Sequence, residues 1–283
     1  MRIVIPCILA LLSVPMAVFG AEQAQAARWN AQGTFSLLPA ANLHGTSSDA
    51  GITDYRVRLS QTLTIDKRLS LTIGGGYGLK HIDAPAAADL PPDLHALFLD
   101  AGAHYHIDDR SFATLKLMPG FYSDFGDIGS EDLRMPLIAL GGYRFESGVT
   151  LVGGFVYRAG YHAASFIPVL GLSYQPNEQW KIDLMLPRPG ITYSPSRTLK
   201  CFLAGDFASD EYELHGRSRG VRALRYSDLK AMAGIEYQAA NELRLTAATG
   251  YAFERRFSFY DGTRGDLRLD DAPFMRLTVD IGW

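Results

Sequence analysis

The sequence predicts an all-β protein, a transmembrane antiparallel up-and-down β-barrel of about 14 strands. Three observations support this class. Apolar and polar side chains alternate with a period of two, short and long connections alternate along the chain, and aromatic residues gather at strand ends. The alternation is clearest from Leu69, where one face holds Leu69, Leu71, Ile73, Gly75, Tyr77 and Leu79 and the other holds small or polar residues. Successive strand side chains point to opposite sides, so such a strand has one apolar and one polar face.

We predict strands over residues 29–38, 54–65, 69–80, 95–107, 111–121, 132–145, 149–158, 165–174, 180–190, 198–207, 210–215, 227–237, 243–257 and 273–283. The region from Pro187 to Glu213 is the least regular, because Pro187, Pro189 and Pro195 cannot donate to a ladder. Merging pieces there would give 12 strands. An even number of strands places both chain termini on the periplasmic side, as bacterial barrels require.

The connections differ in length in a regular way. Short turns are expected at residues 66–68, 108–110, 146–148, 176–178 and 240–242, and longer segments at 40–53, 81–93, 123–131, 216–225 and 258–271. Bacterial outer-membrane barrels have short periplasmic turns and longer outer loops. We therefore expect the short turns on the periplasmic side and the long segments outside.

Aromatic residues gather near both expected strand ends, as in the interfacial girdles of membrane barrels. Toward the short turns lie Tyr105, Tyr143, Phe145, Tyr174, Trp180, Tyr237 and Trp283. Near the long segments lie Phe121, Tyr122, Tyr157, Tyr161, Tyr193, Phe257, Phe259 and Tyr260. The alternative is that these rings cap the core of a soluble sandwich.

The N-terminus predicts export. Met1-Arg2 precedes an apolar stretch from Ile3 to Phe19, and small residues follow, as in Ala24-Gln25-Ala26. This order is typical of a cleaved signal peptide. We therefore divide the chain into a signal peptide, residues 1–26, and an outer-membrane β-barrel domain, residues 27–283. An uncleaved N-terminal anchor is the alternative. The expected location is the cell outer membrane.

Composition excludes several other classes. No run of about 20 apolar residues follows the signal, so we expect no membrane-spanning helix. The net charge of −3 argues against a nucleic-acid partner. Residues 27–283 keep one cysteine, Cys201, with no metal-type spacing around it. We therefore expect no cofactor, no metal site and no catalytic residues.

Two features resemble known outer-membrane proteins. The alternating segment from Met275 ends in the aromatic Trp283, which is similar to the C-terminal signal read by the barrel-assembly machinery. The segments 117–125, 184–189 with Tyr193, and 250–257 resemble an uncharacterised family of Gram-negative outer-membrane β-barrel proteins, a domain of unknown function. This resemblance implies the fold and the location, and it implies no catalytic residues.

Charged residues of both signs fall on the polar faces. An Arg or Lys facing lipid at the membrane midplane costs about 2–4 kcal/mol, so these side chains should point inward. The candidate lumen-lining residues are Arg56, Arg58, Asp100, Lys116, Arg134, Arg144, Asp183, Lys230, Glu236, Arg244, Glu254, Arg276 and Asp280. They either form ion pairs that stiffen a nearly closed barrel or line a selective pore.

Three functions follow from these alternatives. The first is a porin-like channel or transporter for small solutes, which an open aqueous lumen would favour. The second is a structural or surface-interaction barrel with a filled lumen. The third is an outer-membrane hydrolase, which a cluster of histidine and carboxylate side chains at the loop end would favour; His81 and His95 lie near Asp83 and Asp93. The expected partners are outer-membrane lipid, the barrel-assembly machinery and possible small solutes.

Overall fold

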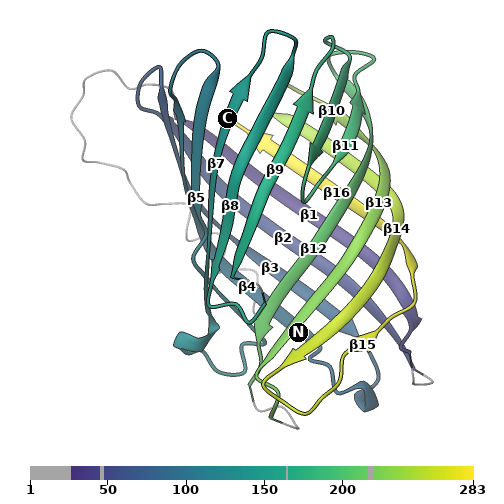
Figure 1. The fold of residues 1–283 in the computed structure, drawn as a ribbon. Coiled ribbons are helices and arrows are strands. Elements are labelled where there is room, and N and C mark those ends of the chain that lie inside the picture. Colours follow the sequence, from purple (N-terminus) through teal and green to yellow (C-terminus); the bar gives the residue numbers. More distant parts are fainter. Residues whose placement is uncertain (1–26, 45–47, 164, 216–219) are drawn as a thin grey trace.

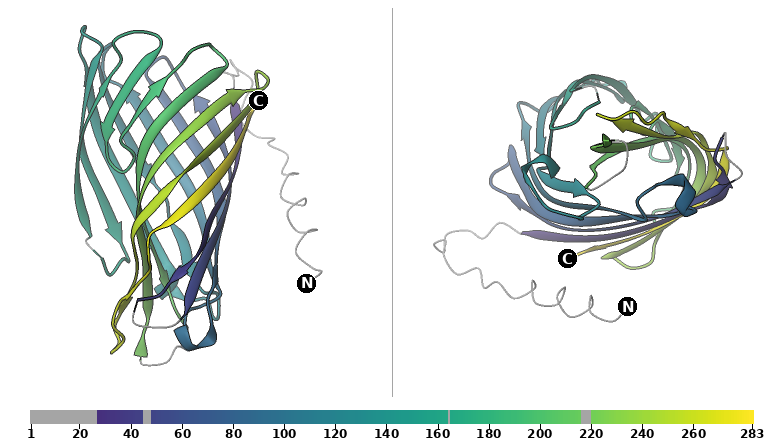
Figure 2. Two further views of the ribbon diagram at one scale, coloured as in Figure 1. Left: turned by 90° about the vertical axis from the view of Figure 1, so that its right-hand side faces the viewer. Right: turned by 90° about the horizontal axis from the view of Figure 1, so that it is seen from below.

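Strand pairing follows the chain order almost throughout and closes the sheet into a barrel (Figures 1 and 2). The computed structural model describes residues 27–44, 48–163, 165–215 and 220–283, so the predicted signal peptide lies outside the described residues. Consecutive strands pair antiparallel, the first strand pairs with the last, and β11 pairs with β12 to complete the ring. The predicted fold class is confirmed.

The strands have these bounds: β1 (Arg28–Asn42), β2 (Asp49–Thr64), β3 (Leu69–Asp83), β4 (Asp93–His106), β5 (Ser111–Leu117), β6 (Gly120–Ser123), β7 (Leu133–Arg144), β8 (Val149–Ala159), β9 (Phe166–Tyr174), β10 (Trp180–Met185), β11 (Gly190–Tyr193), β12 (Leu199–Glu213), β13 (Ala223–Gln238), β14 (Leu243–Tyr260), β15 (Leu267–Arg268) and β16 (Ala272–Gly282). β5 and β6 both pair with β4 and β7, so they form one wall strand interrupted near Pro119. β15 pairs with β14 outside the wall order, which leaves a barrel of 14 strands.

The count of 14 is right, but the strands from Trp180 to Glu213 are divided differently from the prediction. The predicted strand 180–190 ends at Met185, and a turn containing Pro187 and Pro189 leads into the separate strand β11. The predicted strands 198–207 and 210–215 are the single strand β12. Its ladder with β13 runs without a register shift from Leu199 to Glu213, and Asp206 and Asp210 point inward to cations on other strands.

Connection lengths divide the barrel into two ends. The predicted short turns all join strands at one end, which is at the top in Figure 1, and a further short turn at residues 194–198 joins β11 to β12. The longer segments gather at the opposite end, called here the loop end. They include the 3-10 helices η2 (Ala86–Ala88) and η3 (Ser130–Asp132). No helix of the described residues is long and apolar enough to cross a membrane.

The outer surface is apolar, as the alternation predicts. Exposed side chains on the outer face of the wall include Ile73, Leu99, Leu170, Leu203 and Ile235. Eight strands, β1 to β4, β7 and β12 to β14, are longer than the roughly 9–11 residues needed to cross a membrane. Among these, β14 has 18 residues and β2 and β13 have 16 each. We infer that these strands extend beyond a hydrocarbon layer at the loop end.

Inside the loop end, the long strands enclose an apolar cluster, called here the loop-side core. Its members come from β1 to β4 on one side and from β12 to β16 on the other. They include Leu38, Ile52, Leu94, Tyr226, Phe257 and Phe274, each at most 3% exposed. The interior at the loop end is therefore filled with packed side chains over this part of the ring.

Exposed aromatic residues form a band toward each end, but four of the predicted residues depart from it. Tyr105, Tyr143, Trp180 and Trp283 are exposed near the short turns, and Tyr157 is exposed toward the loops. The exceptions are Tyr193, Phe257, Tyr122 and Phe259. Tyr193 lies at the short-turn end with its ring 4.7 Å from that of Trp180, because β11 returns there. Phe257 is fully buried, and Tyr122 and Phe259 pack against the loop-side core.

Candidate functional site: the barrel interior and its loop-end network

Strand register places the predicted lumen-lining residues. Because side chains alternate, a residue opposite an inward-facing partner also faces inward. Thus Arg58 stands opposite Gly76, which stands opposite Phe98, and Arg244 stands opposite Asp280. All the candidates except Glu254 occupy inward positions in this register, although their surroundings differ between the two halves of the barrel. Their role in lining an open path remains a prediction.

Inward charges in the short-turn half keep contact with solvent. Arg58 and Lys116 both pair with the carboxylate of Asp100, and their side chains are 31% and 28% exposed although Asp100 is 1% exposed. The Nζ atom of Lys200 lies 2.8 Å from Oε1 of Glu236, and these side chains are 43% and 24% exposed. Asp183 accepts a hydrogen bond from Ser173 and is 29% exposed. Solvent therefore reaches inward-facing side chains in this half.

Inward charges in the middle of the barrel are more enclosed. Lys230 and Asp228 pair with each other and are both buried. Asp206 lies between Arg276 at 2.8 Å and Arg188 at 3.0 Å. A buried charge needs a partner, because desolvation is costly for an isolated ion. These pairs therefore neutralise the region where the polar half of the interior meets the loop-side core.

Arg56 belongs to the same middle layer. It lies 4.0 Å from Asp210, whose other carboxylate oxygen is 3.4 Å from the ammonium group of Lys80. Lys80 also donates to Asp54 at 2.5 Å. Strands β2, β3 and β12 are thus joined across the interior by alternating charges.

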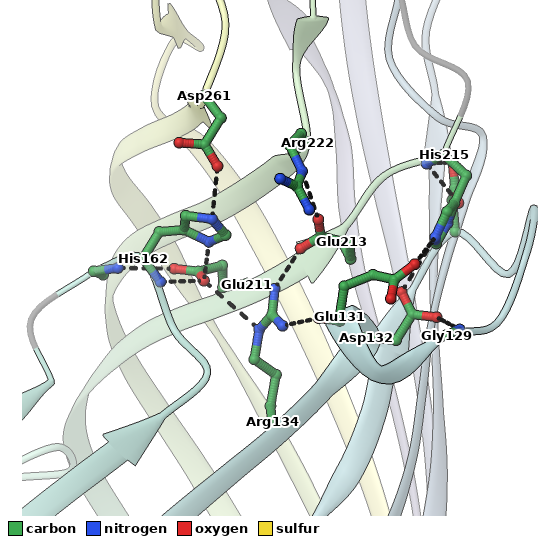
Figure 3. A network of polar contacts seen from close by, with 12 residues as sticks. Gly129, Glu131, Asp132, Arg134, His162, Glu211, Glu213, His215, Arg222 and Asp261 are labelled. Atoms are coloured by element: carbon green, nitrogen blue, oxygen red, sulfur yellow. Dashed lines mark hydrogen bonds and ion pairs between the residues drawn. The ribbon is translucent and has the colours of Figure 1, made fainter.

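At the loop end, Arg134 is the centre of a buried polar network (Figure 3). The arginine is 1% exposed; its Nη2 atom donates to Oε2 of Glu213 at 2.8 Å, and its Nε atom lies 3.7 Å from Oε1 of Glu211. Glu211 also accepts hydrogen bonds from the backbone N–H groups of His162 and Ala163. The network therefore ties the end of β12 to β7 and to the loop between β8 and β9.

His215 fixes a second loop to the network. Its Nδ1 atom lies 3.1 Å from Asp124, and its Nε2 atom lies 3.6 Å from Asp132. Burial lowers the pKa of this imidazole, but the hydrogen bond with Asp124 and the charges of Asp132, Asp124 and Asp127 outweigh that effect. The net pKa is raised. His215 therefore keeps its positive charge to a higher pH than a free histidine does.

Glu254 departs from the predicted alternation. The register between β13 and β14 shifts between Ser227 and Leu229, and Glu254 has a φ of 50°. Such a bulge adds a residue to one strand and redirects the side chains that follow. Glu254 is exposed, whereas Arg255 is 1% exposed and donates to the carbonyl of Asp270. Arg255 thus takes the inward position that the sequence pattern assigned to its neighbour.

Histidine–carboxylate pairs do occur at the loop end, and the arrangement around His162 differs from that of a catalytic triad. Both ring nitrogens of His162 contact carboxylates, Glu211 at 3.2 Å and Asp261 at 2.9 Å. His81 pairs with Asp93, and His95 with Tyr77. A base needs one nitrogen directed at a nucleophile. Within the described ranges no such serine contact occurs, nor a group of three metal-type ligands.

Several residues of the interior were not among the candidates. They are Lys80, Asp206, Asp210, Glu211, Glu213 and Arg255. Alternation already places Lys80 and Asp206 on the polar faces of their strands. Glu211 and Glu213 carry a different signal, because strict alternation along β12 would direct both toward lipid with Phe207. Two adjacent acidic positions on that face indicate a strand end beyond the hydrocarbon layer.

A closed antiparallel barrel with an apolar exterior and a charged interior is the architecture of outer-membrane β-barrel proteins. A family model described as a domain of unknown function, DUF6268, matches residues 85–267 of this chain. The chain belongs to that family. No curated protein matches it.

Two solved structures share the fold. An outer-membrane channel from Pseudomonas putida F1 has 12% identity and a TM-score of 0.52, with 96% of this chain and 100% of that chain covered. A deltaS2 mutant of the TodX monoaromatic hydrocarbon channel has 12% identity and a TM-score of 0.50, with 90% and 89% covered. At such low identity the likeness shows the fold alone.

Proposed function

We propose that this protein is an outer-membrane channel for small solutes. The observation that carries the proposal is the partial exposure of inward-facing charges in the short-turn half, as for Arg58, Lys116 and Lys200. Water reaches these side chains inside a closed wall, which is the condition for an aqueous path. Two structures of similar fold are described as channels, which supports the proposal without naming a solute.

The test of this function is a conductance measurement with a charge variant. Mature protein refolded into a planar bilayer should give discrete current steps, and Lys116→Gln should make the pore more cation-selective. The reason is that Arg58 and Lys116 both pair with the single carboxylate of Asp100, so Lys116→Gln removes the one positive charge that these three residues carry in excess. The reversal potential in a salt gradient measures this change.

Lys67→Gln is the matched control for Lys116→Gln. It removes the same charge from an exposed position in the turn at residues 66–68, outside the wall. An equal shift of the reversal potential for both variants would mean that Lys116 does not face the conducting path. Silent bilayers would overturn the channel itself.

A structural or surface-interaction barrel is the second candidate. The loop-side core fills part of the interior, and Arg134, Glu211 and His215 hold the loops in place. Ordered loops on a filled interior suit a surface that binds another molecule. The absence of any conductance, together with an intact fold in lipid, would favour this candidate.

Trp283 supports both the closure of the barrel and the proposed location. Its backbone exchanges hydrogen bonds of 2.8 and 3.0 Å with Trp29, and the two rings stack with centroids 6.4 Å apart. Trp283 is also 56% exposed at the short-turn end, where an indole can lie in the membrane interface. Removing it takes away one residue pair at the end of a long ladder.

Deletion of Trp283 should therefore lower the amount of protein in the outer membrane more than it lowers the melting temperature of refolded protein. The ladder loses only the backbone hydrogen bonds of one residue pair, whereas the aromatic end that resembles an assembly signal is lost completely. Trp283→Phe should keep the outer-membrane level, since it keeps an aromatic end. The measurements are quantification in membrane fractions and thermal unfolding in detergent. Intact mature protein in the soluble periplasmic fraction would contradict the barrel's location.

A further inference from the structure

The wall ladder is interrupted between β9 and β12. β9 pairs with β10 from Gly171 to Tyr174, and its residues 166–170 have no partner on that side among the described residues. β12 pairs with β11 only up to Ala204; beyond it, the N–H groups of Gly205 and Phe207 donate to the carbonyls of Pro189 and Pro187. Residues 208–212 have no partner strand on that side within the described part of the chain. We call residues 166–170 and 208–212 the edges of the β9–β12 gap.

Proline positions indicate that the gap is encoded by the sequence. Arg158 donates to Ser165, so odd-numbered residues of β9 direct their backbone groups toward β8 and even-numbered residues direct theirs toward the gap. The even position 168 is a proline, which has no N–H. On the other side, Pro187 and Pro189 stand opposite Phe207 and Gly205, where a continuing ladder would need two donors. Proline in a sheet is confined to such unpaired edges.

The gap has a fixed border on every side. The β10–β11 hairpin fills only the part of the space between β9 and β12 that is nearer the short turns (Figure 1). Arg188 in its turn pairs with Asp206 of β12. At the loop end, Glu211 holds the N–H groups of His162 and Ala163 at 2.7 and 3.2 Å. The two edges are therefore bridged at both ends of the gap, by Arg188 and Asp206 nearer the short turns and by Glu211 at the loop end.

The outer side of the gap belongs to the apolar surface of the barrel. Leu170 is 82% exposed, Phe166 and Leu186 are each 59% exposed, and Phe207 is 47% exposed. Backbone groups left unpaired at this level are tolerated only where they line a water-filled space. The free edges of β9 and β12 must therefore be solvated from the interior, which connects the lumen with the lipid-facing surface.

The interior side of the gap offers a way around the loop-side core. Ile167 and Val169 face inward at the edge of β9, and Ile167 is 38% exposed. The loop-side core occupies the barrel between β1 to β4 and β12 to β16, away from these residues. A molecule in the lumen thus meets a packed core along the axis and an unpaired, partly apolar edge to the side.

We propose that the β9–β12 gap is a lateral passage through which small, largely apolar solutes move between the lumen and the membrane lipid. The proposal rests on the channel function above and names its solute class. Apolar side chains on both outer edges favour such solutes, and the polar groups of Arg188 and Asp206, at the border nearer the short turns, keep the inner mouth wet. A strongly charged solute would lose its hydration on entering the lipid and is excluded.

The test uses N-phenyl-1-naphthylamine, a dye that fluoresces on entering phospholipid, and intact Gram-negative cells whose outer membrane slows its entry. Cells that make the protein should take up the dye faster than cells that lack it. Ser209→Trp, at the edge of the gap, should reduce uptake to the rate of cells without the protein. Ser227→Trp is the matched control, because Ser227 stands opposite Ser209 in register and its own strand is paired on both sides.

A second pair protects the test against misfolding. Leu170→Trp at the gap is compared with Leu172→Trp, which lies on the same outer face but opposite Leu184 in the paired ladder. Heat-modifiable migration on gels verifies that each variant is folded. Uptake that is equal in gap and control variants, or absent in the wild type, overturns the lateral passage. Conductance of the wild-type protein in planar bilayers tests the channel separately, so a conducting protein with gap-independent dye uptake keeps the proposed function and loses this inference.

Discussion

Arg134→Met is expected to lower the free energy of unfolding by about 3–5 kcal/mol, the range for leaving buried charges without their partner. The Arg134 side chain is 2% exposed, and those of Glu211 and Glu213 are 0% and 4% exposed. Methionine keeps the volume of the arginine stem but leaves the two carboxylates without this cation. Urea unfolding of protein refolded in lipid vesicles measures the change.

Arg144→Met is the control for this prediction, because Arg144 faces inward from the same strand but is exposed. A surface cation contributes little, so its loss should cost well under about 1 kcal/mol. Adding Glu213→Gln to Arg134→Met should restore part of the stability, since one of the two unbalanced charges is then removed. Equal losses for Arg134→Met and Arg144→Met would contradict a buried network at the loop end.

The sequence was sufficient to predict which side chains face outward on most strands. β3, β4, β7 and β16 carry apolar or small residues at alternate positions along the middle of each strand, and a shift of one residue would turn this apolar face inward. Trp283 and Trp29 meet as the closing of a barrel requires. The pattern alone also predicted the short turns, because residues such as Asp66 and Asp108 accept hydrogen bonds from backbone groups within three positions.

The rest depends on partners distant in the chain. Alternation places Asp206 on the inward face of β12, but the cations that neutralise Asp206 and Asp210 come from other strands, and no local pattern identifies Arg276, Lys80 and Arg56 as these partners. Arg134 and Glu213 are 79 positions apart. The sequence could therefore identify Arg134 as an inward charge, but it could not distinguish a buried centre of a network from a side chain that lines water.

The gap between β9 and β12 is a second feature that the sequence alone could not predict. Pro187 and Pro189 are visible in the sequence as breaks, and Pro168 lies in a predicted strand. Only the register shows that all three stand where a ladder between β9, the hairpin and β12 would need donors. The sequence thus identifies the three prolines, and the strand register shows that they border the same gap in the wall.

Leu137→Arg should reduce the stability of the protein in lipid by about 2–4 kcal/mol, the cost of an arginine on the lipid face near the midplane. Leu137 lies on the outer face of β7 opposite Leu117 and Tyr157. Ile138→Arg changes the adjacent residue to the same side chain, but Ile138 stands opposite Lys116 and faces the interior, where solvent reaches Lys116.

The new charge at position 138 is therefore hydrated and faces only modest repulsion from Lys116, whereas the charge at position 137 must enter hydrocarbon. We expect Ile138→Arg to fold into vesicles nearly as well as the wild type and Leu137→Arg to fold poorly. The measurements are the folded fraction in vesicles and the urea midpoint. If both variants lost the same stability, the two faces of β7 would not differ in solvent. The outer surface of this barrel would then not be in contact with lipid at Leu137.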